Sequence, residues 1–112
     1  LMGERFGIIA ILEQSTVRQR RAVRLAGFES RYAGSLPIGV GAEELEGDKV
    51  RDRMVEVGQT LIETNGANVL IMGCAGMACY RTHIERTLGV PVIDPSQAAA
   101  IQAMAAVRLA RA

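Results

Sequence analysis

The sequence predicts an α/β fold built on a parallel sheet, and three observations lead to this prediction. Short apolar runs of strand length alternate with longer stretches of helix-forming residues along the chain. Residues 6–12 are continuously apolar and residues 67–72 nearly so, which is typical of strands buried on both faces of a parallel sheet. The 112 residues are 49% hydrophobic, enough for one core, so we expect residues 1–112 to form a single domain.

The chain begins with a predicted strand followed by a predicted helix. Residues 6–12 form the strand. After it, Ser15 or Thr16 can cap the N-terminus of a helix, because their hydroxyl groups accept hydrogen bonds from free backbone amides. Gly27 is expected to end this helix, since glycine readily adopts the left-handed conformation found at helix C-termini.

The middle of the chain predicts an edge strand, a surface loop and a long helix. Residues 28–36 mix aromatic, hydroxyl and basic side chains before Pro37, which favours an outer strand. Residues 38–47 contain three glycines and are predicted to form a loop. A helix then begins at Asp48 and ends before Asn65. Its apolar residues recur at helical spacing: Val50, Met54, Val57 and Leu61.

The last part predicts two more strands and two more helices. Residues 67–72 form a strand, and residues 73–76 form the turn that leads from it into a helix ending at Gly89. Residues 90–93 then form a short strand, and Ser96 caps the final helix. The side chains expected to face inward from these two helices are Met77, Tyr80, Ile84 and Leu88, then Ile101, Met104 and Ala105. Four strands alternating with four helices predict a four-stranded parallel sheet with right-handed crossovers and helices on both faces, a three-layer arrangement.

Composition excludes several classes of function. The net charge of +1 gives no reason to expect binding to nucleic acid or to an anionic membrane. The arginines of residues 18–24 are expected to form a solvated face of a helix. No apolar run is long enough to span a bilayer and no signal sequence opens the chain, so a soluble, cytoplasmic protein is expected. Two cysteines do not form a disulfide framework, and no glycine pattern for a dinucleotide or a triphosphate follows either main strand.

Cys74 is the residue most suited to chemistry. Ligands of parallel α/β sheets bind at the carboxyl ends of the strands, here residues 12–16, 73–77 and 93–96. Cys74 follows the 67–72 strand between two glycines, where free amides at a helix start would lower a thiol's pKa. The alternative is that Cys74 is a small buried apolar residue, and position alone leaves both interpretations open.

The other polar residues near this edge are weaker candidates. The hydroxyl groups of Ser15 and Thr16 could hold a carboxylate, although capping alone explains them. On a helix, Cys79 would point about 140° away from Cys74. His83 shares a face with Cys79, but these residues supply too few ligands for zinc, so no metal is expected. Asp94 precedes a proline, the usual setting of a turn.

Two segments together resemble the Asp/Glu/hydantoin racemase family, in its hydantoin and allantoin racemase branch. They are Val69-Leu70-Ile71-Met72-Gly73-Cys74-Ala75-Gly76-Met77 and Leu88-Gly89-Val90-Pro91-Val92-Ile93-Asp94-Pro95, with residues 5–9 as a matching first strand. The resemblance covers essentially the whole chain, as the C-terminal half of a two-domain racemase. It implies a flavodoxin-like or Rossmann-like half and a cofactor-independent isomerase.

The resemblance implies roles for individual residues. Cys74 is implied to be one of two catalytic thiols that face opposite sides of a carbon next to a carbonyl, so that one removes a proton and the other donates one. The expected substrate-binding residues are Ser15, Thr16, Gly73, Ala75 and Gly76. Ser15 and Thr16 are included for their position at the sheet edge, because Ala10 and Ile11 stand where many family members carry hydroxyl residues. The substrate would be a small carboxylate or a hydantoin, and a homo-oligomer is expected.

The chain departs from the family in lacking the second cysteine. In the family that cysteine belongs to an N-terminal domain, and Cys79 cannot replace it on helical geometry. A missing domain or a partner chain is therefore expected, and the chain alone should be inactive. The alternatives are a decarboxylase or maleate-type isomerase of the same superfamily, a non-catalytic module that binds small carboxylates, and a redox sensor using Cys74 and Cys79, which their spacing disfavours.

Overall fold

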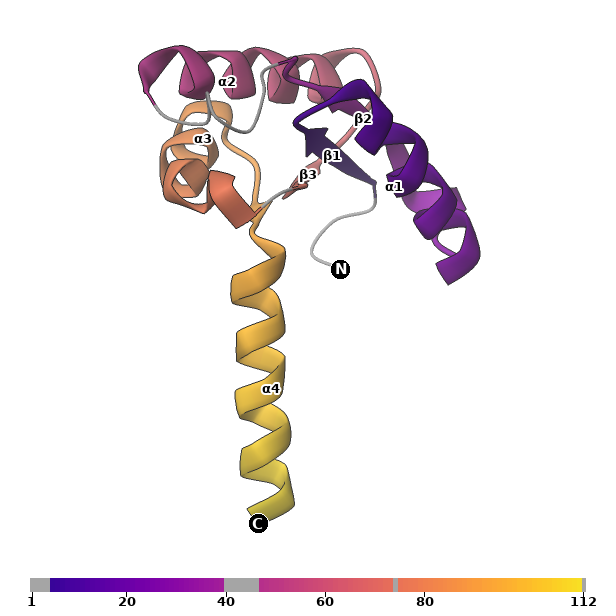
Figure 1. The fold of residues 1–112 in the computed structure, drawn as a ribbon, viewed down its shortest axis with the longest axis vertical. Helices are drawn as coiled ribbons and strands as arrows, with labels where there is room; N and C mark the ends of the chain where they lie inside the picture. The colour runs from indigo at the N-terminus through magenta and orange to yellow at the C-terminus, as the bar shows by residue number, and fades with distance from the viewer. Residues whose placement is uncertain (1–4, 40–46, 74, 112) are drawn as a thin grey trace.

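Four parallel strands form one sheet at the centre of the molecule (Figure 1). The structure, a computed structural model, describes residues 5–39, 47–73 and 75–111. The strands are β1 (Phe6–Ala10), β2 (Tyr32–Pro37), β3 (Val69–Met72) and β4 (Val92–Ile93), in the order β2-β1-β3-β4. The predicted parallel sheet is confirmed, and β2 lies at an edge as expected.

Helices connect the strands in the predicted alternation. They are α1 (Glu13–Ala26), α2 (Asp48–Glu63), α3 (Arg81–Leu88) and α4 (Pro95–Arg111), with 3₁₀ turns η1 (Glu29–Arg31) and η3 (Ala75–Tyr80). The helix predicted after residues 73–76 therefore starts as a 3₁₀ turn and becomes α-helical only at Arg81. Part of the predicted 38–47 loop lies outside the described residues.

The main core lies between the sheet and the helices α2 and α3. The predicted stripe of α2 is confirmed, because Val50, Met54, Val57 and Leu61 are all buried. They pack with alternate residues of the strands and with Ile84 of α3. Burial of each large side chain contributes about 1.5–3 kcal/mol, so this layer dominates the stability of the fold.

The opposite face of the sheet is only partly covered. There Phe6, Ile8 and Val69 pack with Val23 of α1 in a second cluster. Strand side chains alternate between faces, which is why Ile8 belongs to this cluster and Ile9 to the main one. Because α1 packs on β1 and β2, the outer part of this face, on β3 and β4, is less well covered and Ile93 is only half-buried.

The final helix differs from the sequence prediction. Ile101, Met104 and Ala105 were expected to face inward, yet all three are exposed, Ile101 by 67% and Met104 by 61%. Figure 1 shows why: α4 leaves the end of β4 and extends away from the sheet without folding back on it. No described residue of α4 is buried, so the prediction of an inward face was wrong for this chain.

Both predicted N-caps were also wrong. The helix α1 begins at Glu13, with Leu12 at the cap position, so Ser15 and Thr16 lie inside its first turn. At α4, Asp94 takes the role expected of Ser96: its carboxylate accepts hydrogen bonds from the backbone amides of Ser96 and Gln97, each at 3.3 Å. In both cases the helix begins before the predicted capping residue. The predicted stop of α1 at Gly27 is confirmed, with φ of 82°.

Among the described residues, no helix is both long enough and apolar enough to cross a membrane.

Candidate functional site

The carboxyl ends of β1 and β3 meet at one edge of the sheet, where the sequence predicted a ligand site. The backbone amide of Gly73 donates a hydrogen bond to the carbonyl oxygen of Ile9 at 2.8 Å. This bond extends the pairing of the two strands by one residue beyond Met72. It places the chain entering Cys74 beside the beginning of α1, so two of the three predicted segments are neighbours.

A cavity of about 370 Å³ lies between α1 and this strand end. Its lining residues are Ser15, Arg18, Gln19, Ala22 and Gly73. Four of them recur at spacings of three, one and three along α1, so they form one face of that helix. The cavity is therefore bounded by a polar and basic helix face and by the backbone that leads into Cys74.

Gly73 allows the close approach on which this cavity depends. A Cβ atom at this position would lie 2.7 Å from Nε2 of Gln19 and 2.7 Å from the backbone oxygen of Ile9. Neither distance is tolerable for a carbon atom, and the backbone oxygen has little freedom to move. The side-chain amide of Gln19 thus rests on the turn into Cys74, and its Oε1 is buried without a hydrogen-bond partner in the described structure.

The structure brings some of the predicted site residues together and separates others. Ser15 and Gly73 line the same cavity. Thr16 does not line it: it is buried, and its hydroxyl donates to the carbonyl oxygen of Glu13 at 2.6 Å. Ala75 and Gly76 open the 3₁₀ turn η3 directly after the strand end. Cys74, the predicted catalytic residue, lies outside the described residues.

Sequence reasoning missed Arg18 and Gln19. Arg18 had been assigned to a solvated basic face, and Gln19 had attracted no attention. The signal that would have found them is their helical spacing from Ser15, because residues three and four positions apart share a face. Arg18 is exposed and forms no ion pair with a described residue, so its charge is available to an anion.

A second cavity, of about 330 Å³, lies between β4 and the beginning of α4. Its charged groups serve the fold. Asp94 is 3% exposed and caps α4, while Arg81 bonds to Glu85 at 3.0 Å and to the carbonyl oxygen of Val92 at 3.2 Å. Asp94 therefore acts as a helix cap in place of the turn residue that was predicted.

The described residues assemble no metal site. Within the three described ranges, no group of three His, Cys, Asp or Glu side chains is placed to hold an ion. Cys79 is a free, exposed cysteine and His83 is exposed, where its ring nitrogen lies 3.5 Å from the hydroxyl of Thr87.

Comparisons with known proteins identify relatives of this chain. The chain is 33% identical to the hydantoin racemase of Paenarthrobacter aurescens over 96 residues, and 28% identical to that of Pseudomonas sp. (strain NS671), also over 96 residues. In each case 84% of the chain is covered, but only 41% and 39% of the relative. The chain thus spans less than half the length of these relatives.

Two solved structures show the same relation in three dimensions. The allantoin racemase of Pseudomonas fluorescens matches 97% of the chain with a TM-score of 0.91 and 30% identity, over 47% of its own length. The allantoin racemase of Klebsiella pneumoniae matches 96% of the chain with a TM-score of 0.88 and 27% identity, over 44% of its length. The family model described as Asp/Glu/Hydantoin racemase matches residues 1–103. Because the family model matches most of the chain and the relatives agree with it in sequence and fold, the chain belongs to the Asp/Glu/hydantoin racemase family.

Proposed function

We propose that this chain supplies one half of the active site of a cofactor-independent racemase or epimerase that acts on hydantoin-like compounds or amino acids. The observation that carries the proposal is the cavity between α1 and Gly73, whose wall leads directly into Cys74. Membership of the family supports it, and so does the likeness to hydantoin and allantoin racemases.

In the proposed reaction, the Cys74 thiolate removes a proton from the carbon next to a carbonyl group. A second thiol on the opposite face of that carbon donates a proton, which inverts the centre. Backbone amides near the strand end would stabilise the negative charge that develops on the carbonyl oxygen. The second thiol belongs to a second α/β half, in the same polypeptide or in another one. Cys79 does not fit this role because it is exposed on η3, five residues after Cys74.

We assign the substrate-binding surface to the wall of the cavity and to the turn beyond it. Ser15 and Gly73 stay in the proposed site, with Ala75 and Gly76 contributing backbone amides. Arg18 would attract a carboxylate or another anionic group. Thr16 is left out, because the carbonyl oxygen of Glu13 already accepts its hydroxyl proton.

A chimeric enzyme tests the proposal. The 112-residue chain replaces the matched segment of the Paenarthrobacter aurescens hydantoin racemase, and racemisation of a 5-substituted hydantoin is followed by polarimetry in D₂O with mass detection of exchange. We expect turnover by the chimera, a loss of at least about 1,000-fold on Cys74→Ala, and near-normal turnover on the matched control Cys79→Ala. A loss of this size is that of a proton-transfer group.

Two results would contradict the half-site proposal. Full Cys74-dependent turnover by the 112-residue chain alone would show that no second half is needed. A chimera that keeps its rate after Cys74→Ala would remove the thiol from the mechanism. If product analysis instead finds decarboxylation of a malonate or isomerisation of maleate, the chain belongs to another reaction type of the superfamily.

The rival of a different class is a non-catalytic module that binds small carboxylates. The buried, unpartnered Oε1 of Gln19 and the exposed charge of Arg18 are also compatible with this role. The rival predicts that Cys74→Ser keeps ligand affinity and that the thiol reacts with iodoacetamide as an ordinary cysteine with a pKa near ~8.5. Faster alkylation of Cys74 than of Cys79 at neutral pH, slowed by bound hydantoin, favours the enzyme.

A further inference from the structure

The helix α4 has the composition of a buried helix but none of the burial. Its 17 residues include seven alanines and four large apolar residues, with Ser96, two glutamines and two arginines as the polar positions. Figure 1 shows the helix extending from the body of the molecule. The large side chains are exposed by 51–77%: Ile101, Met104, Val107 and Leu109. A helix that is apolar around most of its circumference is normally covered.

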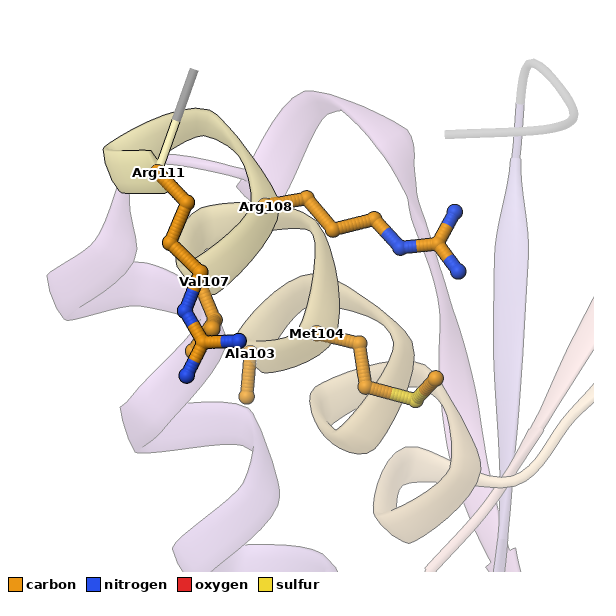
Figure 2. A pocket seen from close by; sticks show the side chains of 5 residues that line it. All are labelled: Ala103, Met104, Val107, Arg108 and Arg111. Atoms are coloured by element: carbon orange, nitrogen blue, oxygen red, sulfur yellow. The ribbon is translucent and has the colours of Figure 1, made fainter.

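Three of these side chains form one surface, which we call the α4 face: Ile101, Met104 and Val107. Their spacing of three residues places them within an arc of about 120°. Shallow hollows lie along this surface, one between Ile101, Met104 and Arg108, the other running on to Val107 and Arg111. Figure 2 shows the side chains of Met104, Val107, Arg108 and Arg111 around the second hollow. Such a surface is suited to receive side chains from a partner.

The direction of α4 is the direction found in a longer, folded racemase. The allantoin racemase of Pseudomonas fluorescens agrees with this chain over 97% of its residues, and α4 makes up 17 of the 112. Agreement that close requires the corresponding helix to leave the sheet in the same direction. An isolated helix of this length is marginal in water and needs a covering surface. More than half of that relative's chain has no counterpart here, so the relative has chain to spare for such a surface.

We propose that α4 is a docking helix for a complementary α/β half like the one that the longer relatives carry, with the α4 face packed in an apolar groove of that half. The identity of this partner rests on the proposed function. The charges of α4 add a condition. Arg108 and Arg111 fall within the same arc as the α4 face, and the helix has no acidic residue, so we expect the groove to present carboxylates near the last turn.

One substitution in two contexts tests the proposal. Met104→Lys puts a charge on the α4 face, and Leu25→Lys is the matched control, since Leu25 is a 77% exposed residue on α1. In the 112-residue chain alone, both variants keep the melting temperature within about 2 °C, because neither side chain is buried there. In the chimera described above, Met104→Lys lowers it by about 5 °C or more, since a lysine would be buried unpaired, and Leu25→Lys does not.

Hydrogen exchange on the same proteins completes the test. The amides of residues 100–110 should exchange rapidly in the chain alone and slowly in the chimera. Equal effects of Met104→Lys in the two contexts would overturn the proposal, as would slow exchange of α4 in the dilute chain alone. Protection that grows with the concentration of the chain would assign the face to a second copy. A chimera that does not fold counts against the fit of the α4 face as well.

These measurements need no substrate. A stable chimera in which α4 is protected but no hydantoin is racemised would keep the docking proposal and refute the proposed function. Cys74→Ala provides the converse control, because it should abolish turnover and leave both the melting temperature and the protection of α4 unchanged.

Discussion

The absence of a Cβ atom at Gly73 determines how closely the chain can pack at the strand end that leads to Cys74. The position of Gly73 has no room for a Cβ, because the backbone oxygen of Ile9 and Nε2 of Gln19 would each lie 2.7 Å from it. The same residue donates the hydrogen bond that extends the pairing of β1 with β3. Any side chain at this position would therefore disturb the sheet and the cavity together.

Gly73→Ala tests this at the residue scale. We expect the free energy of unfolding to fall by about 1–3 kcal/mol, the usual cost of forcing a methyl group into a filled space. The measurement is urea unfolding followed by circular dichroism. The double variant with Gln19→Ala should recover only part of the loss, since the Ile9 oxygen stays in place. An unchanged unfolding free energy for Gly73→Ala would refute the crowding argument.

Residues of the site differ in how far their roles could be read from the sequence. Gly73 and Cys74 were singled out because a strand followed by Gly-Cys-Ala-Gly is a local pattern. Gly73 does line the cavity, whereas Cys74 lies outside the described residues and stays a prediction. Arg18 and Gln19 were missed because their relevance depends on a distant strand end that packs against α1. Thr16 has the right chemistry, but it lies inside the first turn and uses its hydroxyl within the helix.

The sequence predicted the helices and strands correctly where a single local pattern determines them. The stripe of α2 predicted its buried face correctly, because residues at helical spacing have one common environment, the sheet. The caps were misplaced because several polar residues stand near each helix start, and only the path of the chain selects among them. Asp94 was preferred over Ser96 because β4 ends at Ile93 and the chain turns there.

Removing the Asp94 cap should weaken α4 specifically. Asp94→Ala leaves the amides of Ser96 and Gln97 without their acceptor, and a lost cap costs about 1 kcal/mol. We expect a lower helix content by far-ultraviolet circular dichroism and faster amide exchange in the first turn of α4. Ser96→Ala is the control and should leave both unchanged. Equal losses in the two variants would restore Ser96 as the cap.

Considered as a whole, the molecule is a four-stranded sheet with helices on its two faces, plus one extended helix. The apolar pattern of Ile101, Met104 and Ala105 indicated that α4 has a face to cover, but a pattern contains no information about which molecule covers it. The prediction of an inward face assumed that the sheet of the same chain would be the partner. In the structure α4 contributes nothing to that core.

Truncation provides a test at the scale of the whole molecule. A chain that ends at Gln97 keeps Asp94 and its capped amides but loses most of α4. Because no described residue of α4 is buried, we expect its melting temperature to stay within about 4 °C of the 112-residue chain, equivalent to less than about 1 kcal/mol. Differential scanning calorimetry measures this. A larger drop would show that α4 packs on the body of its own chain.

The single attachment of α4 has a mechanical consequence. A helix of 17 residues is about 25 Å long, and this one follows β4 and Asp94 with none of its described residues buried. A rotation of about 10° at that root would move the far tip by about 4 Å, close to the width of one side chain. By this geometry, a small change of angle at Asp94 is enlarged at the far end of the helix.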